Sequence, residues 1–151
     1  MKQSELQIAP MREEDVFQIA EIEKACFSLP WSEACVRSEL TNPLSLWLTA
    51  RIEDSVVGYI GSQTVLGEAD IMNVAVDMRY RRRGIARSLL LELERRLREN
   101  AVYSLTLEVR ASNEAAISLY HMLGYTAVGR RPNYYLKPRE DALILRKEWE
   151  L

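Results

Sequence analysis

Apolar and polar residues alternate along the chain with two periods, one typical of helices and one typical of strands. Apolar residues spaced three and four apart predict four helices, at residues 13–26, 33–40, 85–99 and 113–123. Alternating or continuous runs of apolar and β-branched residues predict seven strands, at residues 6–10, 46–52, 56–64, 71–76, 104–110, 125–129 and 142–146. The pattern therefore predicts an α/β fold.

Polar segments separate these elements. The segment of residues 53–55 is so short that it predicts a tight antiparallel hairpin between the second and third strands. Residues 67–70, Gly-Glu-Ala-Asp, predict a turn before the fourth strand, and residues 130–141 predict a polar loop between the last two strands. Ser32 and either Ser112 or Asn113 are suited to cap the helices that follow them.

A strand, a loop and a helix follow one another between Ile71 and Glu99, and they are followed by the alternating strand Ser104–Arg110. Two strands joined by one helix most simply form a right-handed parallel βαβ unit. The helix carries its apolar residues on one stripe, at Ile85, Leu89, Leu90, Leu93 and Leu97.

The loop before this helix has the features of a phosphate site. Gly84 lets the backbone approach a ligand closely, and the first turn of a helix has N–H groups without intrahelical partners. Arg81, Arg82, Arg83 and Arg87 add positive charge at the same place, which favours a pyrophosphate. A solvated basic turn before an amphipathic helix has the same composition, so both interpretations stay open. The loop is neither a P-loop nor a dinucleotide fingerprint.

Composition and charge exclude several classes of protein. The chain has 151 residues, of which 48% are hydrophobic, and this predicts a single domain spanning residues 1–151. No apolar run approaches the ~20 residues of a membrane span and the N-terminus has no signal-peptide pattern, so a cytoplasmic location is expected. Only Cys26, Cys35 and His121 offer thiol or imidazole ligands, so no metal is expected. A net charge of −2 argues against general nucleic-acid binding.

Two residues are candidates for proton transfer. Glu108 lies on the polar face of its predicted strand, where glutamate is disfavoured, so either an ion pair or a general base explains it. Tyr120 lies on one side of the last helix and can donate a proton to a thiolate, or can simply be a core ring. Asn113, at the start of that helix, would point at the same cleft.

The spacing Arg81-x-x-Gly84-x-Ala86 resembles the acyl-coenzyme A pyrophosphate motif of the GNAT superfamily of N-acetyltransferases. The run Leu107–Tyr125 resembles one branch of it, the ribosomal-protein-alanine N-acetyltransferases, as do residues 27–32, 130–135 and 140–145. The resemblance extends over most of the chain. It departs from the usual motif at Arg81, Ala86 and Met78, where Gln, Gly and Pro are more common.

This resemblance implies the GNAT fold, a mixed central sheet of about six to seven strands flanked by about four helices. It implies that Glu108 accepts a proton and that Tyr120 donates one. It also implies acetyl-CoA as the co-substrate, without a metal. The implied coenzyme-binding residues are Val74, Ala75, Val76, Arg82, Arg83, Gly84, Ile85, Ala86, Arg87 and Asn113.

The expected reaction moves acetyl to the N-terminal amine, in particular an N-terminal alanine, of a small-subunit ribosomal protein. Neither nucleic acid nor a membrane is an expected partner. Trp31 and Tyr134 lie in two segments that would flank the acceptor, although Trp31 can equally hold its helix against the core. Two alternatives stay open: an acetyltransferase acting on lysine side chains or small amines, and a non-catalytic module that binds CoA or RNA.

Overall fold

A computed structural model describes residues 5–151 of the chain, and within them seven strands form one mixed sheet in the order β1-β2-β3-β4-β5-β7-β6. The strands are β1 (Leu6–Pro10), β2 (Ser45–Ile52), β3 (Ser55–Val65), β4 (Glu68–Val76), β5 (Ser104–Arg110), β6 (Thr126–Tyr135) and β7 (Glu140–Glu148). The α-helices are α1 (Val16–Cys26), α2 (Glu33–Ser38), α3 (Ile85–Glu99) and α4 (Glu114–Met122). Short 3₁₀ turns lie at Glu13–Asp15, Glu39–Thr41 and Met78–Tyr80.

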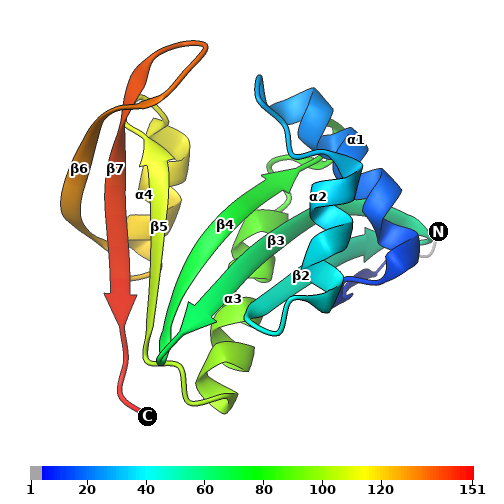
Figure 1. Cartoon of the computed structure of the whole chain (residues 1–151), viewed down its shortest axis with the longest axis horizontal. Helices are drawn as coiled ribbons and strands as arrows, with labels where there is room; N and C mark the ends of the chain where they lie inside the picture. The colour runs from blue at the N-terminus through cyan, green and yellow to red at the C-terminus, as the bar shows by residue number, and fades with distance from the viewer. Residues whose placement is uncertain (1–4) are drawn as a thin grey trace.

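The helices cover the sheet on both faces (Figure 1). Helices α1 and α2 pack on one face around Trp47 and Tyr59, and α3 and α4 pack on the other. Neighbouring residues of β2 therefore enter different cores, because successive strand side chains point to opposite faces. Trp47 belongs to the α1 side and Leu48 to the α3 side.

The two parallel strands of the sheet separate along their length. Strands β4 and β5 pair only between Glu68–Asp70 and Ser104–Thr106, and beyond these residues they diverge (Figure 1). On its other side β4 stays paired with β3, with a shift of register that leaves Met72 as an additional residue. Such a bulge bends its strand and increases the local twist. The sheet therefore opens between the C-terminal parts of β4 and β5.

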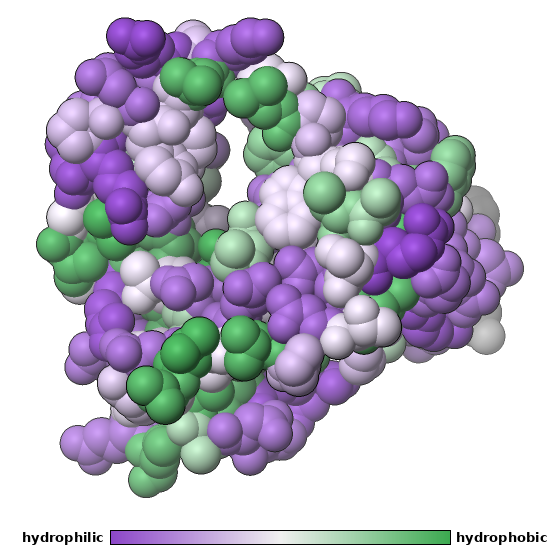
Figure 2. Space-filling view, in the orientation of Figure 1, coloured by the Kyte–Doolittle hydropathy of each residue, from purple (hydrophilic) through white to green (hydrophobic). Residues whose placement is uncertain are grey.

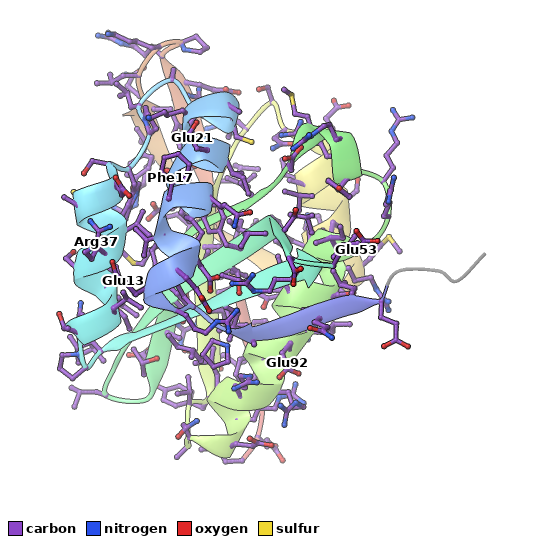
Figure 3. The ribbon with its side chains drawn as sticks, turned by 90° about the vertical axis from the view of Figure 1, so that its right-hand side faces the viewer. Glu13, Phe17, Glu21, Arg37, Glu53 and Glu92 are labelled. Carbon is purple, nitrogen blue, oxygen red and sulfur yellow. The ribbon has the colours of Figure 1, made fainter. Side chains whose placement is uncertain are left out.

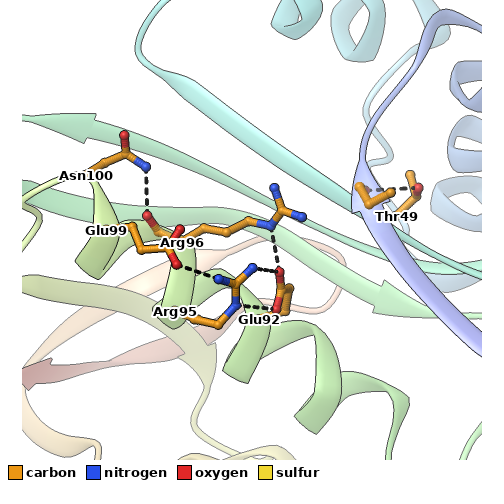
Figure 4. A network of polar contacts seen from close by, with 7 residues as sticks. Thr49, Glu92, Arg95, Arg96, Glu99 and Asn100 are labelled. Atoms are coloured by element: carbon orange, nitrogen blue, oxygen red, sulfur yellow. Dashed lines mark hydrogen bonds and ion pairs between the residues drawn. The ribbon is translucent and has the colours of Figure 1, made fainter.

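Charged side chains form ion pairs on the solvent-facing surface beside α1 and on that of α3. Phe17 of α1 is also exposed on this surface. Figure 3 shows α1 from the side, with Phe17 and Glu21 on the helix and Arg37 of α2 beside Glu13, to which it is bonded at 2.6 Å. On α3, Arg95 bonds Glu92 and Glu99, and Arg96 bonds Glu92 (Figure 4). No helix among residues 5–151 is both long enough and apolar enough to cross a membrane.

Two predictions about polar segments are wrong. The turn before β4 consists of Leu66 and Gly67 only, since β4 already begins at Glu68 and pairs there with both β3 and β5. The segment 130–135, predicted as loop, continues β6 as far as Tyr135. Strand β6 is an edge strand that is exposed along almost its whole length, so it has no buried face to produce an alternating pattern.

Candidate active site

The opening between β4 and β5 is the candidate active site. Past Asp70, β4 keeps its hydrogen bonds to β3 but has no partner strand among residues 5–151 on the side of β5. The space-filling view shows an open passage through the molecule at this place (Figure 2). Val74, Ala75 and Val76 lie on this unpaired edge. Their main chain is available to an extended, amide-rich ligand that adds to the strand edge.

Gly84 stands at the start of α3 in the left-handed conformation, with φ +75°. A Cβ built at this position meets no atom within 4 Å, so the space beside the backbone is open. The first helical bond runs from Ser88 N to Gly84 O at 3.0 Å. The N–H groups of Ile85, Ala86 and Arg87 precede this bond and face the helix end, where the helix dipole favours an anion. The geometry fits a diphosphate.

The four arginines of this region divide into two groups. Arg82, Arg83 and Arg87 are exposed and form no ion pair within residues 5–151. Arg83 lies over the ring of Tyr80, 5.0 Å from its centroid. Arg81 instead bonds the carbonyl of Val76 at 3.3 Å, and its side chain therefore ties the loop to β4. Three of the four side chains are thus free to contact phosphate.

Asn113 caps α4, because its Oδ1 accepts a hydrogen bond from Ala116 N at 3.2 Å. This confirms one of the two caps that the sequence allowed. Its amide Nδ2 has no partner among residues 5–151 and can donate to a coenzyme. Ser32 caps α2 in the same way, accepting from Cys35 N at 3.1 Å.

Glu108 lies on β5 with its carboxylate partly exposed. Its Oε1 is 3.1 Å from Nε of Arg131, a residue of β6. The hydroxyl of Tyr134 also bonds Glu108, and this bond, with burial as the next cause, raises the pKa of Tyr134. The ion pair that the sequence allowed is therefore present, but at this exposure it leaves the carboxylate accessible to a ligand. Tyr134 lies beside Glu108.

Tyr120 is 8% exposed, and its ring meets that of Tyr125 edge to face at 5.9 Å. Its hydroxyl has no hydrogen-bond partner among residues 5–151, and burial raises its pKa to about 12. Tyr135 interacts electrostatically with both Tyr120 and Glu108. With a pKa of about 12, the Tyr120 phenol is protonated at neutral pH.

Trp31 is half-buried and contributes to the core. Its ring lies 5.3 Å from that of Trp47, which stacks on Tyr59 at 5.8 Å. A Cβ at Gly61 would lie 2.2 Å from the Trp47 ring, so only glycine allows this stack.

We call the connection between α1 and α2, residues 27–32, the acceptor loop. Figure 1 shows this loop and the β6–β7 hairpin at the same end of the sheet, on opposite sides of the opening.

Glu23 was not among the candidates from the sequence. It is 1% exposed and accepts hydrogen bonds from Trp31 N at 2.8 Å, from Asn73 Nδ2 at 2.6 Å and from the Tyr59 hydroxyl. A signal was available, since position 23 continues the buried stripe that includes Val16 and the residues at positions 19 and 20. A charged residue at an apolar position of a helix calls for buried partners.

Comparison with known proteins identifies the family. The model of the acetyltransferase (GNAT) family matches residues 16–125. The chain belongs to this family. The expected GNAT fold is confirmed, with acetyl-CoA as the co-substrate of the family's acetyltransferases. Among residues 5–151, no group of three or more His, Cys, Asp and Glu side chains is placed to hold a metal ion.

Two curated relatives match this GNAT chain over most of its length. It is 41% identical over 128 residues to the ribosomal protein bS18-alanine N-acetyltransferase of Salmonella typhimurium, covering 83% of this chain and 85% of that protein. It is 40% identical over 141 residues to an uncharacterised protein of Mycobacterium leprae, but spans only 38% of that protein's length.

Solved structures show the same fold. The ribosomal-protein-S18-alanine N-acetyltransferase from Escherichia coli superposes with a TM-score of 0.90 at 35% identity, covering 97% of this chain and 96% of that one. Arabidopsis thaliana NAA60, solved in complex with acetyl-CoA, superposes with a TM-score of 0.86 over 95% of this chain and 98% of that one. At 18% identity, this second likeness concerns the fold alone.

Proposed function

We propose that this acetyltransferase moves acetyl from acetyl-CoA to the α-amine of an N-terminal alanine in a small-subunit ribosomal protein of the bS18 type, in the cytoplasm. The observation that carries the proposal is the opening between β4 and β5, with an unpaired strand edge on one wall and Glu108 on the other. The names of the relatives from Salmonella typhimurium and Escherichia coli support the choice of acceptor.

The residues that would hold acetyl-CoA follow the two halves of the ligand. The unpaired edge at Val74–Val76 would pair with the pantetheine amides, and Asn113 Nδ2 would donate to the same arm. The N–H groups of residues 85–87 would bind the diphosphate with the side chains of Arg82, Arg83 and Arg87, since the open space beside Gly84 admits it. Bound acetyl-CoA supplies an activated acetyl thioester.

Glu108 would accept the proton of the incoming ammonium, directly or through a water molecule. An α-ammonium has a pKa near ~8 and a lysine ammonium has one near ~10.4. At neutral pH the α-ammonium therefore loses its proton to a base much more readily. A carboxylate is a weak base, and Glu108 is therefore better matched to a protein N-terminus than to a lysine side chain.

Tyr120 would donate its phenolic proton to the sulfur of the departing thiolate. Burial raises the pKa of Tyr120 to about 12, which keeps the phenol protonated over the working pH range. The thiol formed has a pKa near ~8.5, so the transfer is uphill and depends on a hydrogen bond between oxygen and sulfur.

The test uses the full chain, acetyl-CoA and two synthetic peptides with the N-terminal sequence of a bS18 protein beginning with alanine. One peptide has a free α-amine, and the matched control has a formylated α-amine and a free internal lysine. We expect mass spectrometry to find acetyl on the α-amine of the first peptide and none on the second. Acetylation of lysine alone would support the lysine acetyltransferase alternative. CoA binding without acetylation of either peptide would support the non-catalytic one.

A further inference from the structure

The Glu23 carboxylate joins three separate parts of the molecule. Its donors are the backbone N–H of Trp31 in the acceptor loop, the amide of Asn73 on β4 and the hydroxyl of Tyr59 on β3. Glu23 itself lies on α1. A carboxylate that is almost fully buried is retained only when donors compensate for its lost hydration, and here every donor comes from a different element.

The bond to Asn73 reaches the edge of β4 that is proposed to hold the coenzyme. Asn73 directs Nδ2 to Glu23 at 2.6 Å and Oδ1 to the N–H of Val74 at 3.1 Å. If the Asn73 amide were reversed, its oxygen would face the Glu23 carboxylate and its nitrogen would face the N–H of Val74. The carboxylate therefore fixes the orientation of the amide. Asn73 also follows the bulge at Met72, where β4 bends away from β5. Glu23 therefore acts on the main chain of β4 through one side chain.

The bond to Trp31 reaches the opposite side of the opening. The acceptor loop leaves α1 at Cys26 and returns at Ser32, the cap of α2. Between these ends, the Trp31 N–H bond to Glu23 at 2.8 Å fixes the main chain, and the Trp31 ring rests on Trp47. One carboxylate thus sets the position of the loop relative to the strand.

We infer that Glu23 is a positioning residue, which holds the acceptor loop and the Asn73–Val74 segment of β4 in the relative arrangement that acetyl transfer needs. This inference rests on the proposed function. The positioning role is inferred for Glu23 and not for Glu39, which is another buried carboxylate on the α1 side of the sheet. Glu39 accepts hydrogen bonds from Asn42, Ser45 and Gln63, none of which lies in the acceptor loop or in β4.

Glu23→Gln and Glu39→Gln form a matched pair of variants. A glutamine at position 23 has one acceptor oxygen for three donors, and its amide nitrogen would face Asn73 Nδ2. At pH 8, where the Glu23 carboxylate is mostly ionised, we expect Glu23→Gln to raise the KM for the acceptor peptide about tenfold and to lower kcat, because bonds to a buried charged group are lost. The Kd of CoA should rise by less than the KM for the peptide, since Glu23 reaches only the Val74 end of the proposed CoA site and leaves the phosphate loop unaffected. Glu39→Gln should leave KM, kcat and Kd within about threefold of the parent.

Two further variants separate positioning from stability. Tyr59→Phe removes one donor and keeps the bonds to Trp31 and Asn73, so we expect near-parental kinetics. Asn73→Ala removes the connection to Val74, so its effect on kcat should not add to that of Glu23→Gln. A change of KM in Glu39→Gln or Tyr59→Phe as large as in Glu23→Gln, or full additivity of the other pair, would overturn the inference.

Hydrogen exchange of the backbone amides gives a readout independent of turnover. In Glu23→Gln we expect faster exchange at residues 27–32 and 73–74, and in Glu39→Gln we expect parental exchange at both segments. Absence of acetyl transfer by the parent chain would refute the proposed function, while the exchange rates would still decide the role of Glu23. Unchanged exchange at both segments in Glu23→Gln would refute the positioning role.

Discussion

Nε of Arg131, a residue of β6, lies 3.1 Å from the carboxylate of Glu108, a residue of β5. The Arg131 side chain is 55% exposed and that of Glu108 is 28% exposed, so this ion pair is of the weak, solvent-screened kind. An acceptor ammonium would carry the same charge as the guanidinium and could compete for the same oxygen. Under the proposed function, the acceptor ammonium would therefore replace the guanidinium beside Glu108.

Replacing Glu108 by glutamine tests the general base. We expect Glu108→Gln to lower kcat by about 10²- to 10⁴-fold at neutral pH, because an amide cannot accept the ammonium proton. The loss should become smaller above pH ~8, where the α-amine is already deprotonated. Steady-state rates between pH 6 and 9 measure both effects.

A neighbouring carboxylate provides the control for this prediction. Glu68 is an exposed residue of β4 whose carboxylate pairs with Arg146 at 2.9 Å. Glu68→Gln should retain the parental kcat at every pH. Equal rates for Glu108→Gln and the parent would show that Glu108 is only an ion-pair partner of Arg131.

Tyr120→Phe and Tyr125→Phe separate proton donation from core stability. Removing the Tyr120 hydroxyl breaks no hydrogen bond among residues 5–151, so the melting temperature should hardly change, while kcat should fall by about 10²-fold. The Tyr125 hydroxyl donates to buried Glu94 at 2.9 Å. Its loss should destabilise the fold by about 1–3 kcal/mol and leave kcat unchanged. Calorimetry and turnover together check the pair, and the opposite pattern would exclude Tyr120 as the acid.

Gly84→Ala tests the phosphate loop. Alanine in the left-handed conformation is strained by roughly 1–2 kcal/mol, and relief of this strain would turn the N–H groups of the helix end away from the ligand. We expect the Kd of CoA, measured by titration calorimetry, to rise at least tenfold, which corresponds to about one charge-assisted bond.

Gly124→Ala is the matched control, because Gly124 also has a positive φ, of +98°. The atoms nearest to an added Cβ would be those at the flexible end of Lys147, with Cε at 3.3 Å. This variant should lose a similar amount of stability and bind CoA as the parent does. Parental CoA affinity in Gly84→Ala would argue that the diphosphate binds elsewhere.

Local signals were enough to predict most of the fold. The stripe of α3 is buried at Leu89, Leu90 and Leu93, and Ser32 and Asn113 cap their helices as expected. These features depend on residues within one or two turns of each other. The full length of β6 and the start of β4 were missed, because strand pairing defines them and their own residues are mostly polar.

The candidate site was predicted only where a residue type is itself informative. Gly84, Glu108 and Tyr120 could be proposed from the sequence for this reason. The contacts of Glu108 with Arg131 and of Glu23 with Asn73 join residues 23 and 50 positions apart, and no local pattern reports such contacts. The roles of these residues in catalysis stay predictions.

The stability of the fold should depend on the ionisation of Glu23. Burial raises the pKa of Glu23 from 4.5 to about 7, so the folded state holds the proton more tightly than the unfolded state. Stability is therefore greatest below pH 4.5 for this group and falls as the pH rises through 7, by about 3 kcal/mol in all. The Tyr59 hydroxyl bonds the carboxylate, and the Cys26 thiol interacts with it electrostatically. Burial raises the pKa of Cys26, so its thiol stays neutral over this range.

Urea unfolding at pH 5, 6, 7 and 8 measures this dependence in the parent and in Glu23→Gln. We expect the variant to lose less stability than the parent between pH 5 and 8. Asp70, whose pKa burial also raises, contributes equally to both chains. Glu92→Gln is the control, since Arg95 holds the pKa of Glu92 near 2 and its stabilising effect is lost only as the pH falls through that value. Parallel curves for the parent and Glu23→Gln would mean that Glu23 is already ionised in the fold at pH 5.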